Sequence, residues 1–101
     1  MRFKDLAKTF KMLEENMPAG HINNWSNNDG WGIDLNYIDL SPSEIRMLAE
    51  MGWSLGNNTE YDVSREAEME MWEHPQEYTD EEIVELFNKY KSIYTYNNMN
   101  I

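Results

Sequence analysis

The 101-residue sequence has no cysteine, and this absence excludes a disulfide framework and any zinc site built from thiolates. Basic residues are also scarce, because eight Lys and Arg stand against nineteen Asp and Glu, which gives a formal net charge of −11. Phosphates and anionic lipids are bound by basic patches, so the composition argues against direct binding to DNA, RNA or a membrane surface. No apolar run approaches the roughly 18 residues of a membrane-spanning helix. We therefore expect a soluble, cytoplasmic protein.

What the sequence does contain is a large share of apolar residues, 41%, including four Trp, six Tyr, three Phe and eight Met. A disordered acidic tail would carry far fewer, so the chain is expected to fold. Its length suits one domain with a modest core. We predict a single α+β domain over residues 1–101, in which about four helices pack on a short antiparallel β-hairpin or a small sheet.

The first predicted helix is defined by apolar residues that recur at spacings of three and four. The members of this stripe are Phe3, Leu6, Phe10, Leu13 and Met17. Lys4, Lys8 and Lys11 lie off the stripe and are expected to face solvent, and the helix ends before Pro18. A basic amphipathic helix would also suit a membrane surface or a partner groove, but the low net charge of this segment favours packing of the stripe into the core.

The second predicted helix has the clearest ends. Ser41 is expected at the N-cap, Pro42 at the first helical position, and Glu44 three residues after the cap, which together form a capping box. Gly52 follows the last apolar residues and is expected to end the helix in the left-handed conformation. This segment therefore predicts a short helix from about residue 42 to residue 51.

Two further helices are predicted in the second half of the chain. Ser64 is a candidate N-cap for a helix that Pro75 ends, and Thr79 and Glu82 form a second capping box. The residues expected on the apolar face of the last helix are Ile83, Leu86, Phe87, Tyr90, Ile93 and Tyr94. The segment 95–101 is expected to fray.

Strands are predicted from alternation and turn residues. The cluster at residues 27–30 ends in Asp-Gly, a strong hairpin signal, and would join a strand at residues 20–25 to a half-buried strand. The inward-facing residues of this second strand are expected to be Trp31, Ile33, Leu35 and Tyr37. A second hairpin is predicted between residues 53–55 and 61–63.

The sequence contains little that would support catalysis. Its two histidines, His21 and His74, have no cysteine to accompany them, and neither a Gly-rich phosphate loop nor a motif with zinc-ligand spacing is present. Glu73 and Glu77 are near enough to His74 in the sequence for a metal site to be conceivable, but a solvated histidine at a helix end is the better interpretation. We predict a protein that is not an enzyme, with no catalytic residue, no metal ligand and no cofactor.

The strongest feature is the segment from Glu60 to Glu85, where eleven acidic residues stand beside a single base, Arg65. A charge run is usually a solvated face, and the acids at residues 80–82 are explained as the start of a helix, whose dipole favours them. Like charges four residues apart on a helix, however, destabilise it by a few tenths of a kcal/mol per pair. Such pairs in this segment are Glu66–Glu70, Glu77–Glu81 and Glu81–Glu85.

We therefore predict that this segment binds a positively charged partner. Carboxylates on two adjacent helices would roughly imitate duplex phosphates, since a helix rises about 1.5 Å per residue and a duplex carries one charge per about 1.7 Å. Trp72 and Tyr78 would serve as aromatic anchors, although a place in the core is the favoured alternative for Trp72. The predicted partner-binding residues are Glu66, Glu68, Glu70, Glu73, Glu77, Asp80, Glu81, Glu85, Trp72 and Tyr78.

In its composition and in the charge of residues 60–85, the chain resembles small acidic anti-defence proteins of bacterial viruses, which include DNA-mimicking anti-restriction proteins and anti-CRISPR proteins. The resemblance implies an inhibitor, in the cytoplasm of an infected host cell, that occupies a guide, target-DNA or DNA-recognition groove. Its partner would be a basic nucleic-acid-binding protein or a ribonucleoprotein complex. The alternative is a structural or adaptor module that docks through Trp and Met side chains, with the acidic face serving solubility. Self-association is left open.

Overall fold

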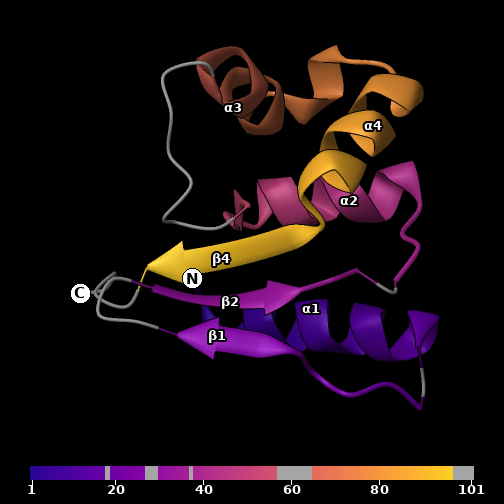
Figure 1. Ribbon diagram of the computed structural model, residues 1–101, viewed down its shortest axis with the longest axis vertical. Helices are drawn as coiled ribbons and strands as arrows, with labels where there is room; N and C mark the ends of the chain where they lie inside the picture. The colour runs from indigo at the N-terminus through magenta and orange to yellow at the C-terminus, as the bar shows by residue number, and fades with distance from the viewer. Residues whose placement is uncertain (18, 27–29, 37, 57–64, 97–101) are drawn as a thin grey trace.

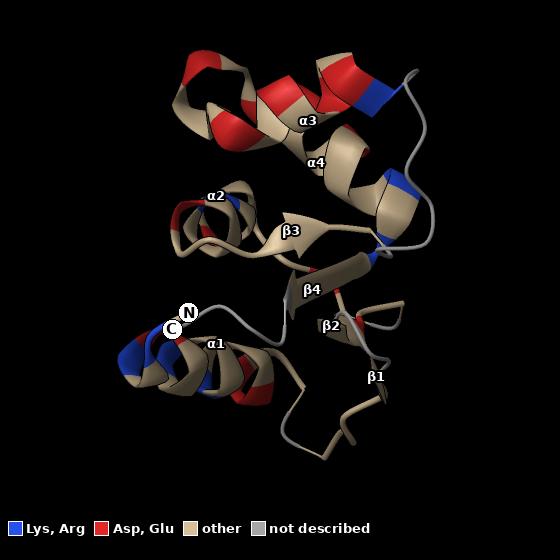
Figure 2. Ribbon diagram, turned by 90° about the vertical axis from the view of Figure 1, so that its left-hand side faces the viewer, with Lys and Arg blue, Asp and Glu red and all other residues tan. Residues whose placement is uncertain are grey.

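The computed structural model describes residues 1–17, 19–26, 30–36, 38–56 and 65–96. Within them, helices pack on a four-stranded antiparallel sheet (Figure 1), which confirms the predicted α+β class. The elements in chain order are α1 (Phe3–Asn16), β1 (Asn24–Ser26), β2 (Gly30–Asp34), α2 (Pro42–Glu50), β3 (Ser54–Leu55), α3 (Glu66–Glu73), the 3-10 helix η2 (Pro75–Glu77), α4 (Asp80–Tyr90) and β4 (Ser92–Tyr96). The helix α1 lies beside β1 and β2, whereas α2, α3 and α4 gather towards β4 and β3 (Figure 1, Figure 2).

The strands lie in the order β1-β2-β4-β3, and each neighbouring pair is antiparallel. The last strand in the sequence is therefore an inner strand of the sheet. Ile93 of β4 pairs with Ile33 of β2 on one side and with Leu55 of β3 on the other. All three side chains are at most 2% exposed. The strand β4 thus joins the N-terminal hairpin to the helical part of the domain.

The C-terminal part of the described chain differs from the prediction. The sequence places Ile93 and Tyr94 on the apolar face of the last helix and predicts fraying from Thr95. In the structure, α4 ends at Tyr90 because Lys91 adopts the left-handed conformation with φ 51°, and the chain then enters β4. Apolar residues continue beyond this reversal at spacings that also fit a helix, so periodicity could not locate the helix end.

The predicted first hairpin is confirmed as the antiparallel pair β1 and β2, but its strands are shorter than predicted, because β1 begins at Asn24 and β2 ends at Asp34, before Leu35. Its turn at residues 27–29 and Tyr37 lie outside the described residues. Trp25 packs over Gly32 so closely that a Cβ at Gly32 would come within 2.4 Å of the indole ring. The second predicted hairpin is not seen in the described chain. There, β3 pairs with β4, and residues 61–63 lie outside the described ranges.

Both predicted capping boxes are confirmed. The hydroxyl of Ser41 accepts a hydrogen bond from the Glu44 amide, and the Glu44 carboxylate accepts one from the Ser41 amide at 2.8 Å. Thr79 and Glu82 make the same two bonds at the start of α4. The hydrogen bond that the Glu44 carboxylate accepts from the Ser41 amide is also the main reason that the pKa of Glu44 is lowered. Local sequence therefore determines where these two helices begin.

The ends of the remaining helices agree with the prediction in part. Gly52 has φ 101° and supplies the left-handed conformation after α2. The helix α3 ends at Glu73, before Pro75, as predicted. Ser64, the predicted N-cap of α3, lies outside the described residues, and the N-cap of α3 is instead Arg65, whose side chain makes no capping bond.

The helix α1 is confirmed, but it packs through a different face from the one predicted. Its buried residues are Asp5, Thr9 and Met12. Of the apolar stripe, Phe3 is 90% exposed and Phe10 is 40% exposed. The helix is therefore rotated so that part of its apolar stripe faces solvent.

This rotation meets the hydrogen-bonding requirement of Trp53, which is 1% exposed. Its indole N–H donates to Thr9 Oγ1 at 3.0 Å, and the Thr9 hydroxyl donates to the Asp5 carbonyl at 2.8 Å. A buried N–H without an acceptor costs about 1–3 kcal/mol. Turning Thr9 inwards satisfies this donor, whereas turning the apolar stripe inwards would not.

Candidate acidic interaction surface

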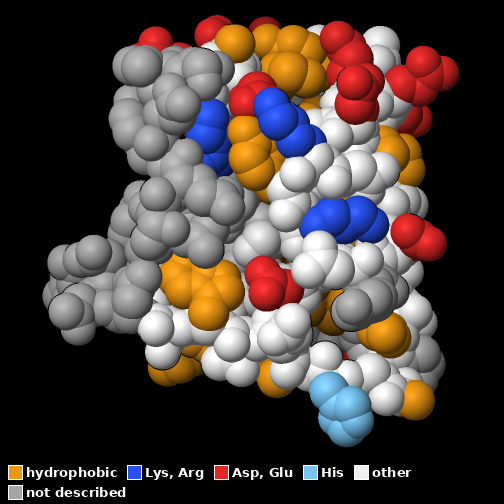
Figure 3. Space-filling view, viewed as in Figure 1, with side chains coloured by type: hydrophobic (Ala, Val, Ile, Leu, Met, Phe, Trp, Pro, Cys, Tyr) orange, Lys and Arg blue, Asp and Glu red, His pale blue; other side chains and the backbone are white. Residues whose placement is uncertain are grey.

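Eight exposed carboxylates lie on α3, η2 and α4, of which Glu82 belongs to the capping box of α4, and we call the other seven the acidic surface. They are Glu66, Glu70, Glu73, Glu77, Asp80, Glu81 and Glu85. Figure 2 shows acidic residues concentrated on α3 at one end of the molecule, whereas α1 at the other end carries both basic and acidic residues. Figure 3 shows Asp and Glu side chains grouped at the same end as α3. All seven belong to the predicted partner-binding set.

Glu70 and Glu73 occupy the most unfavourable positions within the acidic surface, because they lie near the C-terminal end of α3. The helix dipole makes this end partly negative, which disfavours an acidic residue by about 0.3–1 kcal/mol. The last turn of α3 holds no basic residue, and neither carboxylate has a cation within 4 Å among the described residues. Glu66 adds a like charge four residues before Glu70. The local structure of α3 does not explain these acids.

The acids of α4 are easier to explain. Asp80 and Glu81 lie in the first turn, where the helix dipole favours them. Glu85 follows Glu81 by four residues on the same helix, so these two residues form the predicted like-charge pair. Glu77 and Glu81 are not such a pair, because η2 and α4 are separate helices joined through an extended residue, Tyr78.

The nearest base, Arg46 of α2, is used within the fold. Its side chain is 15% exposed, and it forms an ion pair with Asp80. It also donates to the carbonyls of Pro75 at 3.0 Å and Tyr78 at 2.8 Å. Arg46 therefore anchors η2 and the start of α4 to α2, and Asp80 is the one member of the acidic surface that it neutralises.

Arg65 is also turned into the fold. The residue is 7% exposed and donates to the Leu55 carbonyl of β3 at 2.8 Å. Its guanidinium lies 4.6 Å from the centre of the Tyr90 ring, a cation–π contact. The single base of the acidic segment thus connects the start of α3 to β3 and α4.

Glu68 differs from the other predicted partner-binding carboxylates because it links α3 to α4. It accepts hydrogen bonds from Lys89 at 2.7 Å and from the Tyr90 hydroxyl at 2.6 Å, and its side chain is 21% exposed. The bond from Lys89 is the main reason that the pKa of Glu68 lies below its usual value. Burial, followed by the bond to Glu68, raises the pKa of Tyr90. The charge of Glu68 is therefore satisfied inside the protein.

The aromatic anchors predicted for partner binding are not both on the surface. Trp72 is 5% exposed, and its indole N–H donates to the Trp53 carbonyl at 2.6 Å. Its assignment to a partner-binding surface was wrong, because the side chain fills the core and its polar atom is paired there. Tyr78 is half-buried and packs against the core, so part of it remains accessible beside the acidic surface.

Two hollows are bordered by these carboxylates. One, of about 590 Å³, is lined by Glu50, Glu70, Glu73, His74, Pro75, Gln76 and Glu77. The other, of about 500 Å³, is lined by Pro42, Asp80, Glu81, Val84, Glu85 and Asn88. Both hollows are shallow and wide open, so the carboxylates around them are accessible to basic side chains of a partner.

Sequence reasoning missed the contribution of α2 to the first hollow. Glu50 accepts a hydrogen bond from Gln76 at 2.7 Å and so lies beside η2. The two residues are far apart in the sequence, and no local pattern indicates that they meet. Glu50 adds a fourth carboxylate to the rim of that hollow.

His74 was the other candidate for chemistry in this region. It is the exposed C-cap residue of α3, and its Nδ1 lies 3.7 Å from the Glu77 carboxylate. Among the residues that the structure describes, no group of three His, Asp or Glu side chains is placed to hold a metal ion. The carboxylates that surround His74, at Glu70, Glu73 and Glu77, are suited to attracting positive charge.

Comparisons with known proteins do not indicate a family or a function. No protein family matches the sequence, and neither curated proteins nor solved structures gave a significant match. No helix within the described residues is long and apolar enough to cross a membrane. Evidence for a function therefore comes from the geometry and charge of the molecule itself.

Proposed function

We propose that the protein is a non-enzymatic acidic inhibitor that binds a basic nucleic-acid-binding surface on a protein or ribonucleoprotein complex. The observation that carries this proposal is that the bases near α3 are bound within the fold, whereas most of its acids face solvent. The bases Arg46 and Arg65 are turned into the fold, whereas Glu70 and Glu73 face solvent at the negative end of α3 without a neighbouring cation among the described residues. A positively charged partner would offset this unfavourable electrostatic energy when it binds.

The spacing of the charges supports the same proposal. Glu66, Glu70 and Glu73 recur every three or four residues along α3, which is about one carboxylate per 5 Å of helix axis. Glu81 and Glu85 of α4 are four residues, or about 6 Å, apart and provide a second row of similar spacing. Duplex DNA carries one charge per about 1.7 Å, so each row is about three times sparser than duplex phosphates. A groove that holds nucleic acid would attract such a surface.

The compositional resemblance to DNA-mimicking anti-defence proteins is consistent with this proposal and suggests the kind of partner. A protein that binds nucleic acid through Lys and Arg would be steered towards the acidic surface at a rate that falls with ionic strength. Binding there would exclude the nucleic acid from the groove. Inhibition would follow from occupancy, without any bond being made or broken.

The alternative of an adaptor that docks through Trp and Met side chains finds less support around α3. Trp53 and Trp72 are both buried. Met69 and Met71 are half-buried and pack against the core. The apolar side chains of this end are thus largely committed to the fold, which leaves charge as the main property that it offers a partner.

The experiment that tests the proposal is affinity capture from a nuclease-treated bacterial lysate, with wild-type protein and two variants of equal charge change. Glu70→Lys with Glu73→Lys should lose the partner. Asp39→Lys with Ser26→Lys and Asn36→Lys, at exposed positions outside the acidic surface and outside α1, should retain it. Circular dichroism of each variant checks that the fold is intact.

The identity of the captured protein is the second readout. It should be a basic nucleic-acid-binding protein, and added DNA or RNA should release it. The proposal fails if the two variants of equal charge change capture the partner equally well. It also fails if nucleic acid does not compete for the captured protein.

A further inference from the structure

The surface of α1 is the part of the described chain where large apolar side chains are most exposed. Phe3, Phe10 and Ile22 are 90%, 40% and 53% exposed. Phe3 and Phe10 lie on α1, and Ile22 lies in the segment that leads into β1 and lines the same hollow as Phe10. We call the exposed side of α1 together with Ile22 the α1 face. Nothing in the proposed function uses it.

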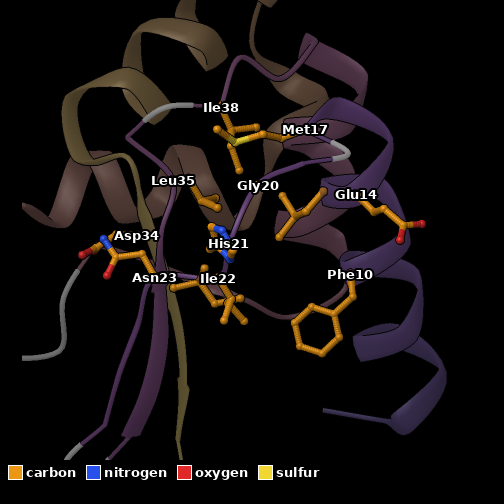
Figure 4. A pocket seen from close by; sticks show the side chains of 12 residues that line it. Phe10, Glu14, Met17, Gly20, His21, Ile22, Asn23, Asp34, Leu35 and Ile38 are labelled. Carbon is orange, nitrogen blue, oxygen red and sulfur yellow. The ribbon is translucent and has the colours of Figure 1, made fainter.

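The α1 face borders an open apolar groove of about 280 Å³ (Figure 4). The groove lies between the second half of α1 and the chain on either side of the β1–β2 hairpin. Its apolar lining residues are Phe10, Leu13, Met17, Ile22, Ile33, Leu35 and Ile38. In Figure 4, the side chain of Glu14 points away from the groove. The groove therefore offers an apolar bed at the C-terminal end of α1.

We propose that the α1 face binds a second copy of this chain, with the two α1 helices antiparallel about a twofold axis near Phe10. Phe3 and Met17 are each seven residues, or about 10 Å, from Phe10 along the helix. An antiparallel pairing centred there brings Phe3 of each copy beside Met17 of the other, at the mouth of the groove. The Phe3 ring of each copy thus contacts the apolar groove of the other copy. The twofold symmetry repeats this contact on both sides of the interface.

The charges of α1 favour the same arrangement. Lys4, Lys8 and Lys11 balance Asp5, Glu14 and Glu15, so the helix has no formal net charge. Its bases lie in the first eleven residues, and its last turn carries Glu14 and Glu15. Antiparallel pairing places Lys4 of each copy within one residue, or about 1.5 Å, of the level of Glu15 of the other. A parallel pairing would instead place Lys4 beside Lys4 and Glu15 beside Glu15.

The position of the acidic surface removes the main electrostatic objection to self-association. Each copy carries a net charge of −11, which would oppose contact through the acidic end. That surface lies on α3 and α4, at the opposite end of the molecule from α1 (Figure 2). Two copies joined through α1 therefore keep their acidic surfaces apart and available to a partner.

The contact would be small, because a 14-residue helix is about 21 Å long. Stable interfaces usually bury about 800 Å² on each partner, and one helix face with its flanking residues supplies less. We expect a weak dimer, with a dissociation constant on the order of 10 µM.

Sedimentation velocity from about 1 µM to 1 mM tests the proposal, because this range spans the expected dissociation constant. The mass should rise with concentration from 12.1 kDa towards twice that value. Phe3→Asp should weaken dimerisation at least tenfold without loss of fold, since Phe3 is 90% exposed. Ala67→Asp, the same new charge at an exposed position on α3, should leave dimerisation unchanged.

Charge reversal tests the antiparallel pairing. Lys4→Glu should weaken dimerisation several-fold, and Lys4→Glu combined with Glu15→Lys should restore it. Failure of the double variant to restore the dimer would overturn the antiparallel register. The whole proposal would be overturned if the mass remained that of a single chain at about 1 mM, roughly a hundred times the expected dissociation constant. The groove would then be free to bind a different partner. A dimer that Phe3→Asp does not weaken would also overturn the proposal.

Discussion

The two ends of this molecule distribute apolar and charged side chains in opposite ways. At α1, Phe3 faces solvent while Asp5 and Thr9 are buried. At α3, Trp72 is buried while Glu70 and Glu73 face solvent. Residue type alone therefore does not decide which side of a helix packs inwards. At α1 the inward side carries a hydrogen-bond acceptor for the Trp53 indole, and at α3 it carries a large ring whose N–H has its own acceptor in the core.

Replacing an aromatic side chain at each end gives the largest expected contrast. Trp72→Ala should lower the free energy of unfolding by about 3–5 kcal/mol, because it leaves a cavity beside Trp53. Phe3→Ala should change it by less than about 0.5 kcal/mol, because the ring is 90% exposed. Urea denaturation followed by tryptophan fluorescence and circular dichroism measures both. Equal losses at the two positions would contradict the described packing.

The rotation of α1 can be tested at Thr9. Thr9→Val keeps the shape of the side chain but removes the acceptor of the Trp53 indole N–H. The expected loss is about 1–3 kcal/mol in the free energy of unfolding, as for other buried donors left unpaired. Thr9→Ser, which keeps the hydroxyl, is the matched control and should lose less. A Val variant as stable as the Ser variant would mean that this bond does not orient α1.

The Glu68 bridge gives a smaller effect with a defined pH dependence. Because Lys89 lowers the folded-state pKa of Glu68 below 4.5, the bridge stabilises the fold above that pH and loses its effect as the pH falls through the folded value. Glu68→Gln should therefore destabilise the protein at pH 7 by about 0.2–1 kcal/mol. The difference from wild type should vanish in acid. Urea denaturation at pH 7 and at successively lower pH measures it.

The acidic surface should lower stability slightly. Glu70→Gln removes a negative charge from the negative end of α3 and from beside Glu66, so it should raise the free energy of unfolding by a few tenths of a kcal/mol. Asp80→Asn, in the first turn of α4, should instead lower it slightly, because the helix dipole and the ion pair with Arg46 both favour an acid there. If both changes act in the same direction, the account of the helix ends is wrong. Thermal unfolding of the two variants makes the comparison.

Much of the fold could be predicted where the cause is local. The boxes of Ser41 with Glu44 and of Thr79 with Glu82 depend on residues three apart, so the sequence alone locates both helix starts. The inner strand β4 was missed because Lys91, a residue with no preference for positive φ, ends α4. The strand is then determined by distant partners in β2 and β3, which no nearby residue indicates.

The candidate site was predictable for similar reasons. Isolated carboxylates such as Glu70 and Glu73 remain exposed because burying an unpaired charge is prohibitive, so their placement follows from their chemistry. The inward bond of Glu68 was not predictable, since Lys89 lies 21 residues away. The burial of Trp72 was the favoured alternative, and the structure settles it through the bond to Trp53. The exposure of Phe3 depends on Thr9, which the apolar pattern does not include.

The most direct test of the central claim is the affinity for the captured basic partner measured at rising ionic strength. For the wild-type protein, the logarithm of the association constant should fall steeply with the logarithm of salt concentration, as expected when many charges are neutralised. For Glu70→Gln with Glu73→Gln, the affinity should be at least tenfold lower and the slope shallower. An affinity that is independent of salt and equal in the two proteins would contradict binding through the acidic surface.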